Sequence, residues 1–210
     1  MSGPGACRFV GNDVVDLAAA RERWDDADAR WIARHLTSAE MESLQAAPAE
    51  DRARFFWSLF AAKEAASKAF AQAGIETPPG GFTCIEVDLR RARAREVASG
   101  REAAILFPRS DEQKIHALAL VSEEAVAEED ILHGVANVPA GCDPSAYVRE
   151  RLTLSASSRS GMAPREAWTV GSVEGRPQFL VSGRWLDWSV SLSHAGRFAA
   201  WSCLVPPASA

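Results

Sequence analysis

The stretch from Phe55 to Phe70 constrains the fold more than any other part of the chain. It contains neither glycine nor proline and is rich in alanine, leucine, lysine and glutamate, a composition that predicts a helix. At about 100° per residue, one stripe of this helix is apolar, and Trp57 and Phe60 extend apolar surface towards the opposite side. Much of its circumference therefore requires burial.

Glu64 and Lys68 interrupt this apolar surface, because both lie almost in line with Trp57 along the helix. A buried carboxylate is costly unless a cation or a metal ion neutralises it, so Glu64 is a candidate functional residue. The alternative is an ion pair between Glu64 and Lys68 on a solvated face, which stabilises a helix by about 0.2–0.5 kcal/mol. The spacing alone favours the ion pair, and the choice depends on the rest of the chain.

Length and charge limit the class of protein. A chain of 210 residues suits one domain or two small, fused halves. The net charge of −5 argues against general nucleic-acid binding, and no apolar run is long enough to span a membrane. The N-terminus lacks the basic and apolar regions of a signal peptide. We therefore expect a cytoplasmic protein in which the isolated cysteines are buried thiols; they are Cys7, Cys84, Cys142 and Cys203.

Residues 9–17 begin as an apolar strand and then meet two carboxylates, Asp13 and Asp16. Asp16 is suited to cap a helix that begins immediately after it. Asp13 follows a glycine and an asparagine and has two interpretations, a residue at a strand end or turn, or a functional carboxylate.

The rest of the first half predicts helices followed by strands. Residues 27–45 predict two helices, and Thr37 and Glu40 have the spacing of a capping box at the start of the second one. A longer helix is expected over residues 50–72, closed by Gly74. Further expectations are strands at 82–89, 103–107 and 115–121, a solvated turn for the arginine-rich residues 90–95, and a helix-compatible acidic segment at 123–129.

Glycines and prolines between residues 133 and 144 mark the clearest internal boundary. They divide the chain into a first half at 1–132, a linker at 133–144, a second half at 145–205 and a tail at 206–210. The second half predicts a helix at 145–154, a loop at 156–164, two strands around a glycine-containing turn within 168–180, and a strand, a tight turn at 194–197 and a return strand over 188–202.

Three short motifs occur in a fixed order: GNDVVD at 11–16, FAAKEAASKA at 60–69 and SLSH at 191–194. Together they resemble the 4′-phosphopantetheinyl transferase superfamily. The motif order is similar to the short holo-acyl-carrier-protein synthase type, a homotrimer with sites between subunits. The length and the second half look like the longer type, in which two halves surround one site. The resemblance implies an α+β fold of two similar α/β halves with antiparallel sheets, packed as a pseudo-dimer in a monomer.

The resemblance also implies a reaction. The phosphopantetheine arm of coenzyme A is transferred to a serine of an apo acyl or peptidyl carrier protein, and adenosine 3′,5′-bisphosphate is released. A magnesium ion is implied, with Asp13 and Glu64 as its ligands, and Lys68 directed at phosphate oxygens. Ser193 and His194 match the coenzyme A contact motif, and Arg176 is a weaker candidate for phosphate binding. Glu64 and Lys68 are the expected catalytic residues, with Glu64 preferred as the general base through a water on the metal.

Two positions depart from the family pattern. Val15 replaces a second acidic residue of the longer type, so the metal would keep an extra water unless Asp16 joins it. Ala19 replaces an arginine with which the short type docks its carrier protein.

Two other functions stay open. One is a catalytically idle relative that binds coenzyme A or a carrier protein. The other is a magnesium-dependent phosphodiesterase, which would leave the SLSH motif unexplained. The sequence leaves open whether the carrier serves fatty-acid, polyketide or nonribosomal-peptide synthesis.

Overall fold

The structure is a computed structural model that describes residues 8–25, 27–78, 81–124 and 126–205. Its helices are α1 (Leu17–Asp25), α2 (Ala29–His35), α3 (Ser38–Ala46), α4 (Arg52–Gln72) and α5 (Pro144–Ser160). Its strands are β1 (Arg8–Asp16), β2 (Ile85–Asp88), β3 (Arg93–Glu96), β4 (Glu102–Leu106), β5 (Lys114–Ser122), β6 (Ile131–Asn137), β7 (Trp168–Val173), β8 (Arg176–Val181), β9 (Arg184–Trp185), β10 (Val190–Ala195) and β11 (Phe198–Leu204). The strand pairings of the described residues are antiparallel, which confirms the predicted α+β class.

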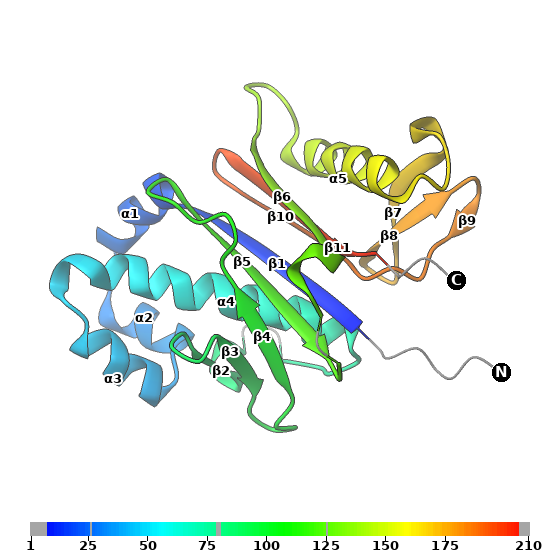
Figure 1. The fold of residues 1–210 in the computed structure, drawn as a ribbon. Helices are drawn as coiled ribbons and strands as arrows, with labels where there is room; N and C mark the ends of the chain where they lie inside the picture. The colour runs from blue at the N-terminus through cyan, green and yellow to red at the C-terminus, as the bar shows by residue number, and fades with distance from the viewer. Residues whose placement is uncertain (1–7, 26, 79–80, 125, 206–210) are drawn as a thin grey trace.

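The first sheet has the strand order β1-β5-β4-β3-β2, and α4 lies across one of its faces (Figure 1). Alternate residues of β1 and β5 face the helix, where Val15, Ile115 and Ala117 join the largest apolar cluster. The helix contributes Phe56, Leu59 and several alanines to the same cluster, and α1, α2 and α3 lie together near one end of α4. The predicted burial of α4 is confirmed.

Gly11 allows β1 to approach α4 closely. A Cβ atom at this position would lie 1.9 Å from the carbonyl oxygen of Ala65 and 2.8 Å from the backbone nitrogen of Ala69. Both neighbours are backbone atoms of a helix and cannot rotate away, so a side chain does not fit here. The glycine of the GNDVVD motif therefore determines how near the following Asp13 lies to the helix that carries Glu64 and Lys68.

We expect Gly11→Ala to destabilise the protein by more than about 3 kcal/mol, because the overlap exceeds ordinary overpacking, which costs about 1–3 kcal/mol. Urea unfolding at neutral pH measures this. Gly74→Ala is the control, since its Cβ would meet no atom within 4 Å and only its positive φ of 76° opposes alanine, at about 1–2 kcal/mol. An equal loss in both variants would show that the contact between β1 and α4 can relax.

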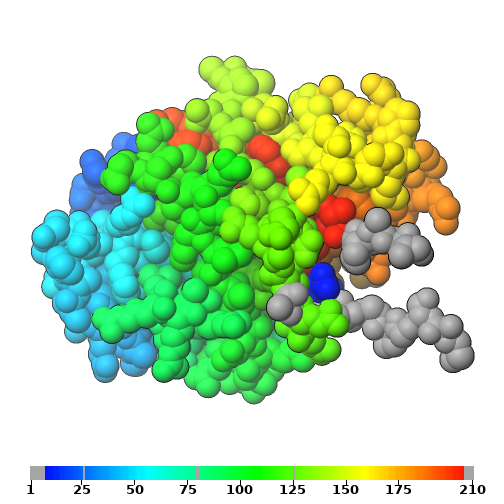
Figure 2. Space-filling model, in the orientation of Figure 1, coloured from blue at the N-terminus to red at the C-terminus, as the bar shows by residue number. Residues whose placement is uncertain are grey.

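The second part of the chain contains two smaller sheets, with strand orders β10-β11-β6 and β7-β8-β9. Helix α5 packs on them, and its Val148, Leu152 and Ala156 form a cluster with Trp168 and Phe179. In the space-filling view, α5 and the orange strands gather at one end of the molecule and the cyan helices at the other (Figure 2). Each part therefore has an apolar core of its own.

The two parts meet along β1. On the face of the first sheet away from α4, Val10 and Leu118 pack against Ile131 of β6 and Leu204 of β11. The free edge of β1 faces a row of serines, which we call the serine row: Ser189, immediately before β10, and Ser191 and Ser193 within β10. Their hydroxyl oxygens accept the backbone N–H groups of Val10, Asn12 and Val14 at 2.7, 2.9 and 3.3 Å respectively. Side-chain oxygens thus satisfy backbone donors that would otherwise lack a strand partner.

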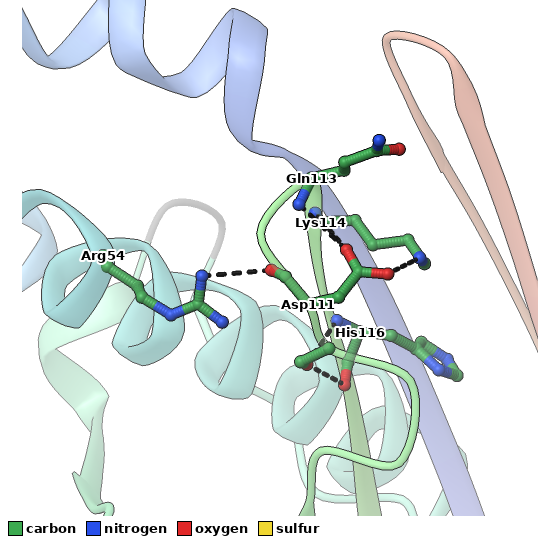
Figure 3. Close-up of polar contacts among 6 residues, drawn as sticks. Arg54, Asp111, Gln113, Lys114 and His116 are labelled. Carbon is green, nitrogen blue, oxygen red and sulfur yellow. Dashed lines mark hydrogen bonds and ion pairs between the residues drawn. The ribbon is translucent and has the colours of Figure 1, made fainter.

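The connection between β4 and β5 is tied to α4 (Figure 3). Arg54 of α4 donates to the carbonyl oxygen of Asp111 at 3.0 Å. The Asp111 carboxylate accepts the backbone N–H of Gln113 at 2.9 Å and pairs with the Lys114 ammonium. Ser110 accepts the backbone N–H of His116 at 3.0 Å, and this bond fixes the turn relative to the start of β5.

Several predictions of local structure are confirmed. The capping box is present, with the Thr37 hydroxyl accepting the Glu40 N–H and the Glu40 carboxylate accepting the Thr37 N–H. The expected hairpin within 168–180 is the pair β7 and β8, and the expected return at 194–197 joins β10 to β11. No helix in the described ranges is long and apolar enough to cross a membrane.

Other predictions require correction. The arginine-rich turn ends at residue 92, because residues 93–96 form β3 and pair with β2 and β4. The acidic segment 123–129 forms no α-helix among its described residues, and α5 continues to Ser160 through part of the expected loop. Cys142 is exposed, while Cys203 is buried as expected. Cys7 and the predicted tail at 206–210 lie outside the described residues.

The predicted linker at 133–144 also changes. Its first residues, 133–137, lie in β6 and pair with β11, so the second sheet begins before the proposed boundary. With β6 included, each part consists of a strand, one or more helices and then antiparallel strands. This shared order supports a pseudo-dimer, and the similarity of the two halves stays a prediction.

Candidate active site

A cavity of about 290 Å³ lies where the end of β1 meets α1, α4 and the hairpin of β10 and β11. Three of the predicted site residues line it, Asp13, Glu64 and His194. The rest of its wall is formed by Val14, Val15, Asp16, Ala19, Ala20, Arg23, Trp57, Phe60, Ala195 and Gly196. The structure therefore brings together residues that are 180 positions apart.

Asp13 is fixed by two hydrogen bonds to the same carboxylate oxygen. Lys68 Nζ and Ser193 Oγ both donate to Oδ1, at 3.0 and 2.7 Å. Lys68 Nζ also donates to the carbonyl oxygen of Asn12 at 2.9 Å. Asp13 is 8% exposed, so its carboxylate has little freedom to leave this geometry. The predicted alternative of an Asp13 with a turn role alone does not account for these contacts.

Glu64 lies one helical turn before Lys68 on α4. Burial raises the pKa of its carboxyl group, and the negative charge of Asp13 raises it further, against a smaller opposite effect of Lys68. Two carboxylates thus act on one another in this cavity, and Lys68 offsets part of their repulsion. The solvated Glu64–Lys68 pair that spacing alone favoured is not what the fold forms, since Lys68 pairs with Asp13.

The donor set fits a hard divalent cation. Asp13 and Glu64 offer carboxylate oxygens in a site with excess negative charge. Within residues 8–25, 27–78, 81–124 and 126–205, no three His, Cys, Asp or Glu side chains form a group that could hold a metal ion. Two carboxylates are oxygen ligands of the kind with which proteins hold a hard cation such as magnesium, whose other ligands are water and substrate phosphates.

Asp16 is engaged elsewhere. Arg197 donates to its carboxylate from the backbone N–H, from Nε and from Nη2, at 3.0, 2.9 and 2.9 Å. The Arg197 side chain, above all, lowers the pKa of Asp16 to about 2. Gly196 adopts a φ of 52°, and a Cβ atom there would lie 2.5 Å from Asp16 Oδ2. Asp16 therefore anchors the β10–β11 turn, which holds His194 at the exposed rim of the cavity.

A second cavity of about 300 Å³ is lined by Lys68, which donates a hydrogen bond to Asp13 in the wall of the first cavity. It contains Arg176 and also Arg149 of α5, for which sequence analysis assigned no role. Arg149 is held by its own helix, where Nη1 donates to the carbonyl oxygen of Ser145 at 2.9 Å. No motif or spacing in the sequence singles out Arg149, because its place beside Lys68 arises from the packing of α5 on the hairpin.

The predicted residues therefore separate into three groups. Asp13, Glu64 and His194 line the first cavity, and Lys68 and Arg176 line the second. Ser193 lines neither of these two cavities and lies behind Asp13.

Comparison with known proteins identifies the family of the chain. A family model described as the 4′-phosphopantetheinyl transferase superfamily matches residues 9–127, more than half of the chain. The chain belongs to this superfamily. The matched region contains Asp13, Glu64 and Lys68 but ends before Arg176, Ser193 and His194, so membership rests on the first part of the chain. A comparison with curated proteins gave no match.

Proposed function

We propose that the chain is a magnesium-dependent 4′-phosphopantetheinyl transferase of the holo-acyl-carrier-protein synthase kind. It would transfer the phosphopantetheine arm of coenzyme A to a serine of an apo acyl or peptidyl carrier protein. The observation that carries the proposal is the cavity in which Asp13 and Glu64 meet beside Lys68, in a member of this superfamily. An idle binding module would not need this costly concentration of buried charge.

The second cavity, lined by basic side chains, is the proposed site for the phosphates of coenzyme A. Lys68, Arg149 and Arg176 present positive charge along one cavity, and guanidinium groups suit phosphate oxygens. His194 lies at the rim of the first cavity. Because Lys68 lines the second cavity and donates to Asp13 in the wall of the first, a pyrophosphate at Lys68 would lie near Asp13 and Glu64, which would hold the magnesium ion. That ion would neutralise charge on the pyrophosphate as it develops.

In the proposed reaction the carrier serine oxygen forms a bond to the β-phosphorus of coenzyme A. The bond from this phosphorus to the oxygen bridging the α-phosphate breaks, and adenosine 3′,5′-bisphosphate leaves. Glu64 is the proposed general base, accepting the serine proton by way of a water molecule. Lys68 orients the pyrophosphate and keeps Asp13 in place.

The site also supports a monomer. Asp13, Glu64 and Lys68 come from the first part of the chain and His194 from the second, and they meet within one polypeptide. We propose that the enzyme acts in the cytoplasm as a monomer with one site per chain. The proposal includes carriers of the fatty-acid, polyketide and nonribosomal-peptide kinds, which share the attacking serine.

Mass spectrometry of an apo carrier protein after incubation with the chain, coenzyme A and magnesium tests the function. We expect the carrier to gain the mass of the phosphopantetheine arm, with adenosine 3′,5′-bisphosphate as the second product. Hydrolysis of coenzyme A without carrier modification would instead indicate a phosphodiesterase. An unchanged carrier and intact coenzyme A, with several carrier classes tried, would indicate a binding module.

A further inference from the structure

We propose that Ser193 is a positioning residue, which fixes the Asp13 carboxylate for a cation and makes no contact with coenzyme A. This inference rests on the proposed function, because it concerns the same site. It differs from the sequence-based expectation, in which Ser193 and His194 both contact coenzyme A. The structure separates these two neighbours, since His194 is exposed and Ser193 is 7% exposed.

The single proton of the Ser193 hydroxyl is committed to Asp13. Oγ donates to Asp13 Oδ1 at 2.7 Å, and the same oxygen accepts the backbone N–H of Val14 at 3.3 Å. A hydroxyl has one donor and two acceptor sites, whereas an ionised phosphate oxygen can only accept. Because the Ser193 proton is donated to Asp13 and the Ser193 oxygen accepts from the backbone of β1, the hydroxyl has no donor left for a phosphate oxygen.

The same contact determines which oxygen of Asp13 is free. Oδ1 accepts from Ser193 and from Lys68, while Oδ2 accepts no hydrogen bond from any residue that the structure describes. One oxygen is therefore held by the protein and the other is available to a ligand in the cavity. Without the Ser193 hydrogen bond, Lys68 would be the remaining donor to the Asp13 carboxylate, and the carboxylate could rotate towards the lysine.

The serine row contains a matched control. Ser191 is 2% exposed, lies on the same side of β10 and accepts the Asn12 N–H at 2.9 Å. It also lines the second cavity, but no contact links it to Asp13, so it is a control for metal dependence and not for coenzyme A binding. Ser189 accepts from Val10 and donates to Gln72 Oε1 at 2.7 Å. All three serines support the edge of β1, and among them Ser193 alone contacts the candidate metal ligand. A change confined to Ser193 therefore separates positioning of Asp13 from support of the strand.

The test compares Ser193→Ala with Ser191→Ala. Binding of Mn²⁺ to the protein without coenzyme A is measured by electron paramagnetic resonance, and the magnesium concentration for half-maximal transfer is measured separately. We expect Ser193→Ala to weaken Mn²⁺ binding and to raise the magnesium requirement about tenfold, as for loss of other residues that orient a metal ligand. The KM for coenzyme A at saturating magnesium should change less than about twofold. Ser191→Ala should leave the metal dependence unchanged, and Ser193→Thr, which keeps the hydroxyl, should restore it.

The opposite pattern would overturn the inference. A raised KM for coenzyme A with an unchanged metal dependence in Ser193→Ala would return Ser193 to a coenzyme A contact. An equal metal effect in Ser191→Ala would show that the strand edge is responsible. If Ser193→Ala does not fold, Ser193→Cys keeps the volume with a weak donor and takes its place. Transfer by the unchanged protein is measured alongside. If the unchanged protein transfers nothing, the proposed function is wrong. If it is active and Ser193→Ala does not alter metal binding, only the inference about Ser193 is wrong.

Discussion

Glu64→Gln is expected to reduce transfer at least about a thousandfold. The change removes a charged ligand of the proposed metal ion, which would neutralise the negative charge that develops on the pyrophosphate during transfer. The amide has nearly the same shape, so packing on α4 should be preserved. Burial and the Asp13 charge raise the pKa of Glu64, which means that folding disfavours its ionised form at neutral pH. The variant should therefore unfold at the same or a higher urea concentration than the unchanged protein.

This combination of lost activity and retained stability is measured by the carrier-modification assay and by urea unfolding at neutral pH. Near-normal turnover at saturating magnesium would show that Glu64 is not a ligand. A large loss of stability would instead give Glu64 a role in holding α4 in place.

Mixing two inactive variants extends the test to the single-chain site. Equal amounts of Glu64→Gln and His194→Ala should stay inactive, because each chain has a lesion in its own site. Recovered activity would place the site between chains, as in a trimer, and would contradict a monomer.

Periodicity predicted which helix residues share one side, although the spacing alone favoured an ion pair and not a functional site. Glu64 and Lys68 are one turn apart, so they lie on the same side of any helix formed by this stretch. Asp13 could be added from the family motif, and Gly11 explains physically why the strand carrying it lies against that helix.

Partners that meet through tertiary packing could not be predicted. The hydrogen bond of Ser193 to Asp13 joins residues 180 positions apart, and the sequence pattern of alternating serines is equally compatible with an ordinary solvated strand. Arg149 was missed for the same reason. His116 reads as part of an alternating strand, yet it is fully buried and burial lowers its pKa to about 3.

The misplaced linker has a local cause. Gly134 in the sequence is typical of a loop, but in β6 it faces Trp201 of β11, and a Cβ atom there would lie 2.4 Å from the Trp201 ring. A glycine within a strand often marks such a close approach. Its large partner lies 67 positions away, so the single sequence gives no means of distinguishing this glycine from one in a turn.

Disrupting the buried ion pair of Glu40 and Lys63 should cause a large loss of stability outside the candidate active site. Lys63 Nζ lies 2.5 Å from Glu40 Oε2, and neither side chain is more than 2% exposed. Burial lowers the pKa of Lys63, against the opposite effect of the Glu40 charge. Lys63 also donates to the carbonyl oxygen of Phe82 at 2.8 Å, and Glu40 Oε1 accepts the N–H of Val87 at 2.7 Å. The pair thus connects α3 and α4 to the edge strand β2.

We expect Lys63→Met to cost about 3–5 kcal/mol, because it leaves a buried carboxylate without its cation. The double variant Glu40→Gln with Lys63→Met should recover part of this loss, since the remaining amide can still bond Val87 without a buried charge. Urea unfolding of both single variants and the double variant measures the coupling. Transfer activity of the folded fraction should stay near normal, because Lys63 turns towards Glu40 and Phe82 and does not line the cavity of Asp13 and Glu64. A cost below about 1 kcal/mol for Lys63→Met would mean that water or a shifted α3 neutralises Glu40, and this network would then not hold α4 against the sheet.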